Sequence, residues 1–320
     1  MVLAKRLSTL LAAAILGLAL DLSAATAAQQ TKFTVLLDWF VNPDHAPLYV
    51  ALERGYFREA GLDVALIAPA DPNDPPKLVA AGKGDVAITY QPQLYFQVDQ
   101  GLPLVRIGTL VNQPLNSLVV LASGPITRIA DLKGRRVGYS VGGFEEAVLG
   151  AMLASAGLTL KDVALINVNF SLAPSLMAGK VDAVIGAFRN FEMNQMAIEG
   201  RPGRAFPVEK YGVPAYDELI LVARRDRVSD PRLRRFLAAL TRAAAYLRAH
   251  PAKSWALFIK GRKELDTELN RRAWRDTLPA FARDPAALDR DRYRRFAGFL
   301  KRHGLIKAVL PVARYAVELR

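Results

Sequence analysis

Residues 33–64 of this chain read FTVLLDWFVNPDHAPLYVALERGYFREAGLDV, and this stretch (Phe33–Val64) decides the fold. It starts with an apolar strand, continues with polar and aromatic side chains, and ends in a helical pattern. A second stretch, KGDVAITYQPQL (Lys83–Leu94), repeats the same order. In α/β proteins the turns that follow such strands hold small molecules. The candidate ligand contacts at these two turns are Asp38, Trp39, Asn42, His45, Tyr90 and Gln91.

Strand-like and helical runs alternate along most of the chain, which predicts an α/β fold with mainly parallel sheets. We expect strands at Phe33–Trp39, Asp63–Ala68, Val86–Tyr90, Val105–Val111, Ser117–Ala122, Arg136–Ser140, Ala164–Asn169, Ala183–Ala187 and Glu218–Ala223. We expect helices near Ala46–Ala60, Pro76–Ala81, Pro92–Gly101, Phe144–Ala156, Ala173–Met177 and Phe191–Glu199. From Pro231 to Tyr315 the pattern is helical throughout, with breaks at Pro251, Pro279, Pro285 and Pro311.

A second strand–loop–helix series begins in the middle of the chain. It opens with DLKGRRVG (Asp131–Gly138), about a hundred residues after the first series. Two lobes with a ligand cleft between them explain this restart, whereas a single long sheet, the alternative, does not. We expect lobe 1 to comprise residues 31–115 plus 223–320 and lobe 2 residues 116–222. The crossings would then lie near Pro114–Ser117 and Leu221–Arg224.

The N-terminus has the layout of a secretory signal peptide. Lys5 and Arg6 precede the apolar run Thr9–Leu20, and small residues follow as far as Ala28. We therefore expect residues 1–28 to be removed on export, with cleavage between Ala25 and Ala28. A retained membrane anchor is the alternative, but the apolar run is short for a membrane span.

The composition excludes several kinds of site. The chain has no cysteine, which rules out disulfides, thiolate nucleophiles and a lipid-modified cysteine. A soluble, monomeric periplasmic protein is the simplest expectation. Residues 224–320 carry 25 Lys and Arg against 10 Asp and Glu, but core-spaced apolar residues interrupt these charges. This spacing is typical of solvated helix faces, so we expect no nucleic acid partner.

The motif D-W-x-x-N-x-x-H-x-x-L-Y-V-A (Asp38–Ala51), followed by G-Y-F (Gly55–Phe57) and G-L-D-V (Gly61–Val64), resembles a known family. These are the periplasmic binding proteins that deliver thiamine pyrimidine precursors to ABC importers. Yeast-type pyrimidine synthases share that fold and motif. The resemblance implies a two-lobed, type II periplasmic binding protein that closes over an aminopyrimidine by a hinge. It also implies an ABC permease as partner, no cofactor and no enzymatic activity.

Aromatic residues at strand ends are the second group of candidate contacts, because a flat heteroaromatic ligand needs rings to stack on. Each stacked face contributes on the order of 1–3 kcal/mol. The candidates are Trp39, Tyr90, Phe144, Phe170 and Phe188. Core packing is the alternative role for each of them.

Polar candidates come from both lobes. Glu192 lies in GAFRNFE (Gly186–Glu192), where the resembling family has an acidic residue, and a carboxylate fits the edge of an aminopyrimidine. The alternative for Glu192 is an ordinary glutamate in the first turn of a helix. Asp38 and the amides Asn42, Asn116 and Asn190 complete the polar set.

Gly142 and Gly143 precede the helix that starts at Phe144, and they would let backbone N–H groups approach a ligand. Glu145 and Glu146 in its first turn would oppose a phosphate. This arrangement favours a neutral or cationic ligand over a phosphorylated one.

Three alternatives to a pyrimidine carrier stay open. The same fold could carry an alkanesulfonate, a riboflavin-like compound or nitrate, and an anion would need arginines, of which Arg189 is the one pocket candidate.

In the related synthases the histidine matching His45 reacts, with pyridoxal phosphate nearby, but those enzymes carry a run of cysteines. GYSVG (Gly138–Gly142) fits the nucleophile elbow of a hydrolase, yet no oxyanion segment accompanies it. With three histidines, we expect neither catalytic residues nor a metal site.

Overall fold

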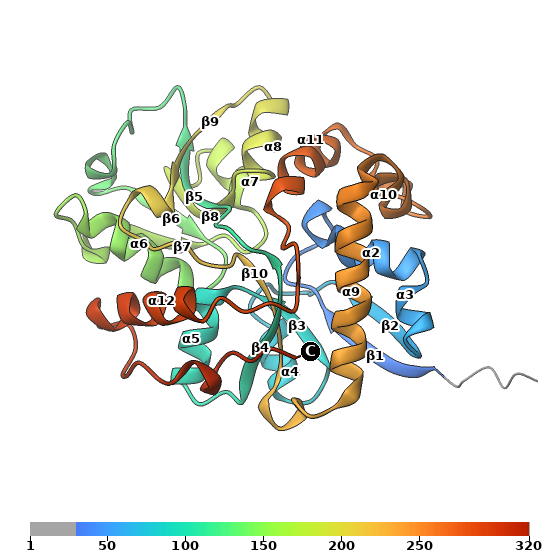
Figure 1. The fold of residues 1–320 in the computed structure, drawn as a ribbon. Helices are drawn as coiled ribbons and strands as arrows, with labels where there is room; N and C mark the ends of the chain where they lie inside the picture. The colour runs from blue at the N-terminus through green and yellow to red at the C-terminus, as the bar shows by residue number, and fades with distance from the viewer. Residues whose placement is uncertain (1–29, 320) are drawn as a thin grey trace, which may run out of the picture. The chain divides into compact units, whose positions relative to one another are not determined.

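The computed structural model describes residues 30–319, which contain two five-stranded sheets (Figure 1). The signal peptide expected at residues 1–28 lies outside the described residues. The first sheet has the order β2-β1-β3-β10-β4, with β1 at Thr31–Leu36, β2 at Leu62–Ile67, β3 at Val86–Thr89, β4 at Leu104–Val111 and β10 at Leu219–Arg224. The second has the order β7-β6-β8-β5-β9, with β5 at Asn116–Leu121, β6 at Arg136–Tyr139, β7 at Ala164–Asn167, β8 at Ala183–Phe188 and β9 at Gly203–Pro207.

Both sheets are mixed, whereas the alternation of strands and helices predicted mainly parallel ones. β1 pairs with β3 in parallel, and β6 pairs in parallel with both β7 and β8. However, β10 runs antiparallel to β3 and β4, and β5 runs antiparallel to β8 and β9. The difference has a topological cause. β5 and β10 carry the chain from one sheet to the other, and no crossover helix before them turns the chain back into the parallel direction.

The structure contains every strand expected from the sequence and one more. The additional strand, β9, lies at the edge of the second sheet and is only partly buried. Its sequence, GRAFP, lacks the apolar alternation of a half-buried strand and ends in proline, so its pattern gave no signal.

Two short segments join the sheets. The first lies between Val111 in β4 and Asn116 in β5. The second ends where β10 begins at Leu219, and Ile220, Leu221 and Val222 pair with β3 in the first sheet. The sequence placed the second crossing near Leu221–Arg224, whereas the structure has it a few residues earlier.

The helices between the strands are short. They are α2 at Ala46–Glu53, α3 at Tyr56–Glu59, α4 at Pro75–Ala80, α5 at Gln91–Asp99, α6 at Phe144–Ala154, α7 at Leu172–Met177 and α8 at Glu192–Ile198. The single helix expected over 46–60 is interrupted at Gly55, whose φ of 74° is left-handed. Among residues 30–319, none of the helices combines the length and apolar character that a membrane crossing requires.

The C-terminal part is helical, with α9 at Pro231–Ala249, α10 at Pro251–Phe258, α11 at Glu268–Thr277 and α12 at Arg290–Arg302. α9 packs against α2 and α3, where the rings of Phe57 and Phe33 stack on Phe236 with centroids 5.1 and 4.9 Å apart. α12 lies beside α5 (Figure 1), and Phe296 of α12 stacks on Tyr95 of α5. Most of this tail therefore covers the first sheet, while α11 also contacts α8 beside the second sheet.

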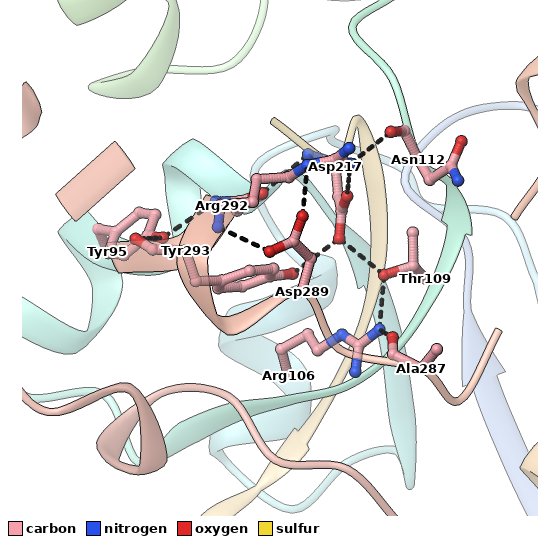
Figure 2. A network of polar contacts seen from close by, with 10 residues as sticks. Tyr95, Arg106, Thr109, Asn112, Asp217, Ala287, Asp289, Arg292 and Tyr293 are labelled. Atoms are coloured by element: carbon pink, nitrogen blue, oxygen red, sulfur yellow. Dashed lines mark hydrogen bonds and ion pairs between the residues drawn. The ribbon is translucent and has the colours of Figure 1, made fainter. Parts of the chain in front are cut away.

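A polar network links the two crossing segments to α12 (Figure 2). Arg292 donates from Nη1 to the carbonyl of Asn112 in the first crossing and to Oδ1 of Asp217 in the second, both at 2.5 Å. Asp217 is buried and also accepts from Thr109 at 2.9 Å and from Tyr293 at 3.2 Å. One side chain of α12 thus holds both crossings.

Candidate functional site

A narrow cavity lies where loops of the first sheet face loops of the second. The first sheet supplies the residues that follow β1 and β3, and the second supplies the end of β8 and the starts of α6 and α8. The lining residues are Asp38, Trp39, Asn42, Asp44, Tyr90, Phe144, Glu145, Leu172, Gly186, Phe188, Phe191 and Glu192. Seven of them were predicted from the sequence, and they come from both halves of the chain.

Asp38 follows β1 and is held by two donors. Its Oδ1 lies 2.9 Å from Nε2 of His45, and its Oδ2 accepts from the hydroxyl of Tyr90 at 2.9 Å. Nδ1 of His45 lies 3.4 Å from the backbone N–H of Asn42, which places the acceptor lone pair on Nδ1 and the donating N–H on Nε2. His45 is fully buried and does not line the cavity, so it orients Asp38 from behind.

Asp44 joins the two halves of the site. It lies in the short 3-10 helix Pro43–His45, and its Oδ1 accepts from Asn190 at 2.6 Å and from Thr277 at 2.8 Å. Asn190 follows β8 and Thr277 ends α11, so three distant segments meet at one carboxyl. Burial raises the pKa of Asp44 to about 6, despite these hydrogen bonds.

Glu192 is the first residue of α8, and its side chain is almost fully buried. Its Oε2 accepts the backbone N–H of Phe188 at 2.7 Å. Burial raises the pKa of Glu192 to about 7, and nearby Asp44 acts in the same direction. Near neutral pH this carboxyl can therefore either donate one hydrogen bond and accept another, or accept two.

Glu145 is a second buried carboxyl in the lining, at 3% exposure. Its Oε2 accepts the backbone N–H of Ser140 at 2.7 Å, and the carboxylate also accepts from Val141. Gly186 is the neighbour that makes room for it, because a Cβ at that position would overlap the carboxylate. Burial raises the pKa of Glu145 well above its usual range.

Aromatic rings form the walls of the cavity. Two of these rings are in direct contact with each other. Tyr90 and Phe144 stack with centroids 5.3 Å apart and planes inclined by 23°. A guest ring between them would need a separation of roughly 7–8 Å, twice the contact distance of carbon atoms. Phe188 meets Tyr90 edge-on at 6.4 Å.

Four predicted contacts lie next to the cavity without lining it. Phe170 packs edge-on against Trp39 with centroids 4.6 Å apart, and Asn190 bonds to Asp44. The Oδ1 of Asn116 accepts the N–H of Gly186 at 3.0 Å. Gln91 points toward the second crossing, where its Oε1 accepts the N–H of Asp217 at 2.8 Å.

The two predicted glycines lie at the rim. Gly142 and Gly143 are exposed and precede α6, and Gly143 has a φ of 82° that favours glycine. Gly142 donates its N–H to Oδ1 of Asn73 at 2.9 Å, and Nδ2 of Asn73 donates to the carbonyl of Ser140 at 3.1 Å. Asn73 precedes α4, so this contact also joins the first half of the site to the second.

Sequence reasoning did not place five lining residues in the site: Asp44, Glu145, Leu172, Gly186 and Phe191. Glu145 was considered only as a group that opposes phosphate. Asp44 stands between Asn42 and His45 in the motif, and its position there was the available signal. Leu172 and Phe191 gave none, because apolar residues at a helix start are equally typical of a core.

Ser140, the central residue of the GYSVG pattern, is fully buried. Its hydroxyl donates to the backbone carbonyl of Asn169. The turn that follows contains Gly142 and Gly143 before the helix starts, so Ser140 is not presented as the nucleophile of a strand–turn–helix elbow.

A family model described as NMT1/THI5 like matches residues 42–254. A Haemophilus influenzae protein named as a thiamine biosynthesis protein is 55% identical over 289 residues, which cover 90% of this chain and 92% of that protein. The formylaminopyrimidine-binding protein of Halalkalibacterium halodurans is 40% identical over 210 residues, covering 66% and 63% of the two chains. The 4-amino-5-hydroxymethyl-2-methylpyrimidine phosphate synthase of Schizosaccharomyces pombe is 26% identical, covering 86% and 82%.

Solved structures of low identity share the fold. The alkanesulfonate-binding protein SsuA from Xanthomonas axonopodis pv. citri superimposes with a TM-score of 0.71 at 16% identity, covering 90% of this chain and 99% of that one. The periplasmic nitrate-binding protein NrtA from Synechocystis gives 0.67 at 14% identity, covering 91% and 87%. These likenesses confirm the predicted fold, the two-lobed α/β fold of periplasmic binding proteins.

Proposed function

The chain belongs to the NMT1/THI5-like family, and on that premise we propose that it is the substrate-binding protein of an ABC importer. Its ligand is an aminopyrimidine precursor of thiamine, which it captures in the periplasm and hands to a permease. The formylaminopyrimidine-binding relative supports a carrier, while the synthases are more distant. The chain then acts as a carrier and not as an enzyme, and residues 1–28 serve for export.

The observation that carries this proposal is the chemistry of the cavity. Its walls are aromatic rings, and its buried polar groups are four carboxyls and the amide of Asn42. Within residues 30–319 its lining holds no lysine, arginine or histidine. Glu192 can pair with an aminopyrimidine edge in either protonation state. The neutral acid donates to a ring nitrogen and accepts from the amine, and the carboxylate accepts from both when the ring is protonated.

The required affinity is within reach of a small ligand. Micromolar binding corresponds to about 8 kcal/mol. Roughly ten ligand heavy atoms can supply this below the ceiling of about 1.5 kcal/mol per atom. One ring contact at 1–3 kcal/mol and the Glu192 pair would contribute a large part.

We further propose that ligand capture closes the two lobes. Lobe 1 comprises residues 31–115 and the C-terminal part, and lobe 2 starts at residue 116, with the second crossing at Asp217–Glu218 instead of 222–223. A ligand that contacts Trp39 and Tyr90 in lobe 1 and Glu192 in lobe 2 favours the closed state, because only differential contact shifts such an equilibrium. The protein acts as a monomer without a cofactor or nucleic acid.

An anionic ligand is the competing candidate, since sulfonate- and nitrate-binding proteins share the fold. The arginine expected for such a ligand is Arg189. It lies outside the lining and pairs with Glu209 at 2.6 Å, while its Nη2 donates to the carbonyl of Pro114. The cavity is therefore better suited to a neutral or cationic ligand.

A thermal-shift and calorimetry panel on the mature chain tests the function. The panel contains formylaminomethyl- and hydroxymethyl-aminopyrimidine, an alkanesulfonate, nitrate and riboflavin. We expect the aminopyrimidines alone to raise the melting temperature, through linkage between binding and folding. A shift with the sulfonate or nitrate, together with none from any pyrimidine, would overturn the proposal.

A further inference from the structure

The loop before α6 has the form of an anion-binding site. The sequence SVGG (Ser140–Gly143) connects the end of β6 to the N-terminus of α6, an eleven-residue helix without a side-chain N-cap. Glycine-rich loops of this kind direct backbone N–H groups at phosphate, and the helix dipole adds to the attraction. The start of α6 also lines the cavity, through Phe144 and Glu145.

Three of the four N–H groups of this loop, those of Ser140, Val141 and Gly142, are already occupied by the chain itself. Glu145 accepts from Ser140 at 2.7 Å and also from Val141. Gly142 donates to Oδ1 of Asn73 at 2.9 Å. A buried carboxylate therefore stands where a phosphate would accept its hydrogen bonds.

The surroundings of the Glu145 carboxyl leave room for it and favour its neutral form. Gly186 has a φ of 95°, and a Cβ there would overlap the carboxyl of Glu145. The N–H of Gly186 is fixed by Asn116, whose Nδ2 is buried and has no hydrogen-bond partner among the described residues. Glu146 and Glu218 add further negative charge near Glu145, and they act with burial to raise its pKa.

We propose that Glu145 is a specificity-determining residue, whose buried carboxyl occupies hydrogen-bond donors of the loop before α6 and so excludes phosphorylated pyrimidines from the cavity. This inference rests on the proposed function and names the class of ligand that the same cavity rejects. A phosphate ester would meet the Glu145 carboxyl at the loop and find the N–H groups of Ser140 and Val141 taken, so rejection follows from missing donors and from occupied space together. An uncharged hydroxymethyl group meets neither obstacle.

The test compares hydroxymethyl-aminopyrimidine with its phosphate ester on the wild-type chain and on Glu145→Ala. We expect the wild type to bind the alcohol at least 100-fold more tightly than the ester. Glu145→Ala withdraws the acceptor from the N–H groups of Ser140 and Val141, so the ratio of the two affinities should fall at least tenfold. Glu146→Gln, on the same helix turn but outside the lining, is the matched control and should keep the wild-type ratio.

A second arm does not depend on any pyrimidine. Glu145→Ala frees the loop N–H groups, so inorganic phosphate should raise its melting temperature while leaving that of the wild type unchanged. Circular dichroism shows whether Glu145→Ala folds. Glu145→Gln, which keeps one acceptor for the loop and frees one N–H group, carries the test with a smaller fall in the ratio if Glu145→Ala does not. Equal affinity of the wild type for alcohol and ester, or unchanged rejection in folded variants, would overturn the inference. Binding of neither pyrimidine by the wild type would instead count against the proposed function.

Discussion

Tyr90 and Phe144 stack directly on each other, with ring centroids 5.3 Å apart. Tyr90 follows β3 in the first sheet, and Phe144 opens α6 beside the second, so this ring pair joins the two halves of the site. The ring pair fills the space that a sandwiched guest would take. A ligand therefore either parts these rings or binds along their edges, toward Glu192 and Trp39.

Phe144→Ala should weaken pyrimidine binding. Loss of one stacking face corresponds to about 1–3 kcal/mol, or roughly 5- to 150-fold in Kd. Isothermal titration calorimetry measures it, and Ile67→Ala on the exposed edge strand β2 is a control outside the cavity. Unchanged affinity in a folded Phe144→Ala protein would remove this ring from the binding surface.

Glu192→Gln should weaken binding by about 1.5–3 kcal/mol, the range for a hydrogen bond to a charged group. The glutamine amide has one acceptor oxygen and cannot ionise. It therefore cannot accept both hydrogen bonds that a protonated pyrimidine ring and its amine donate. Calorimetry with hydroxymethyl-aminopyrimidine measures the change. Glu199→Gln at the other end of α8 is exposed and should bind like the wild type. An equal loss in both variants would point to a general effect on α8 and not to a pyrimidine contact.

The stability of the ligand-free protein should fall as pH rises from about 4.5 to 7. Burial raises the pKa of Glu192 and Glu218 from 4.5 to about 7 and that of Asp44 from 3.8 to about 6. The folded chain therefore binds more protons than the unfolded chain in this window, and the free energy of unfolding decreases with pH. Urea denaturation at pH 5.5 and 8 measures it.

Glu218→Gln should flatten that pH profile, because it removes one of the raised carboxyls while keeping an acceptor for the N–H groups of Leu115 and Asn116. Carboxyls whose pKa is lowered, such as Asp131 with a pKa of about 2, change their protonation below this pH window. They therefore do not alter how stability changes with pH inside it. A stability that increases between pH 5.5 and 8 would contradict the assignment.

Asn190→Ala should speed ligand release. Its amide donates to Asp44 at 2.6 Å and to Thr277 at 2.6 Å, so it stabilises the arrangement in which both halves of the cavity are in contact. We expect koff to rise several-fold in stopped-flow fluorescence, with a smaller change in kon. Gln195→Ala in α8, whose half-buried side chain bonds to Glu199, is the matched control. Identical kinetics of the wild type and both variants would show that Asn190 does not stabilise the closed arrangement.

Arg292→Ala should lower the free energy of unfolding by about 1.5–3 kcal/mol, since it removes charge-assisted hydrogen bonds to Asp217 and Asn112 (Figure 2). Arg290→Ala on the same helix changes an exposed arginine and should have little effect. Urea denaturation compares the two variants. Equal stability of both would mean that the bridge across the crossings contributes nothing.

The strands and helices could be predicted from the sequence because their apolar periodicity is local. The positions of Asp38, Trp39, Tyr90 and Glu192 followed for the same reason, since each comes directly after a strand or at a helix start. The antiparallel direction of β10 could not be predicted. It depends on pairing with strands that lie some hundred residues earlier in the chain. The inward direction of Glu145 depends equally on Gly186, a contact between distant segments.

The bridge made by Arg292 has a mechanical consequence. The crossings are tied together at Asn112 and Asp217, and again where Glu218 accepts the N–H groups of Leu115 and Asn116. Neither segment can change its torsion angles without straining the other, so independent flexing and twisting are suppressed. For the lobe closure proposed above we therefore expect rotation about a single axis, and a fluorophore on either half should report a single relaxation rate.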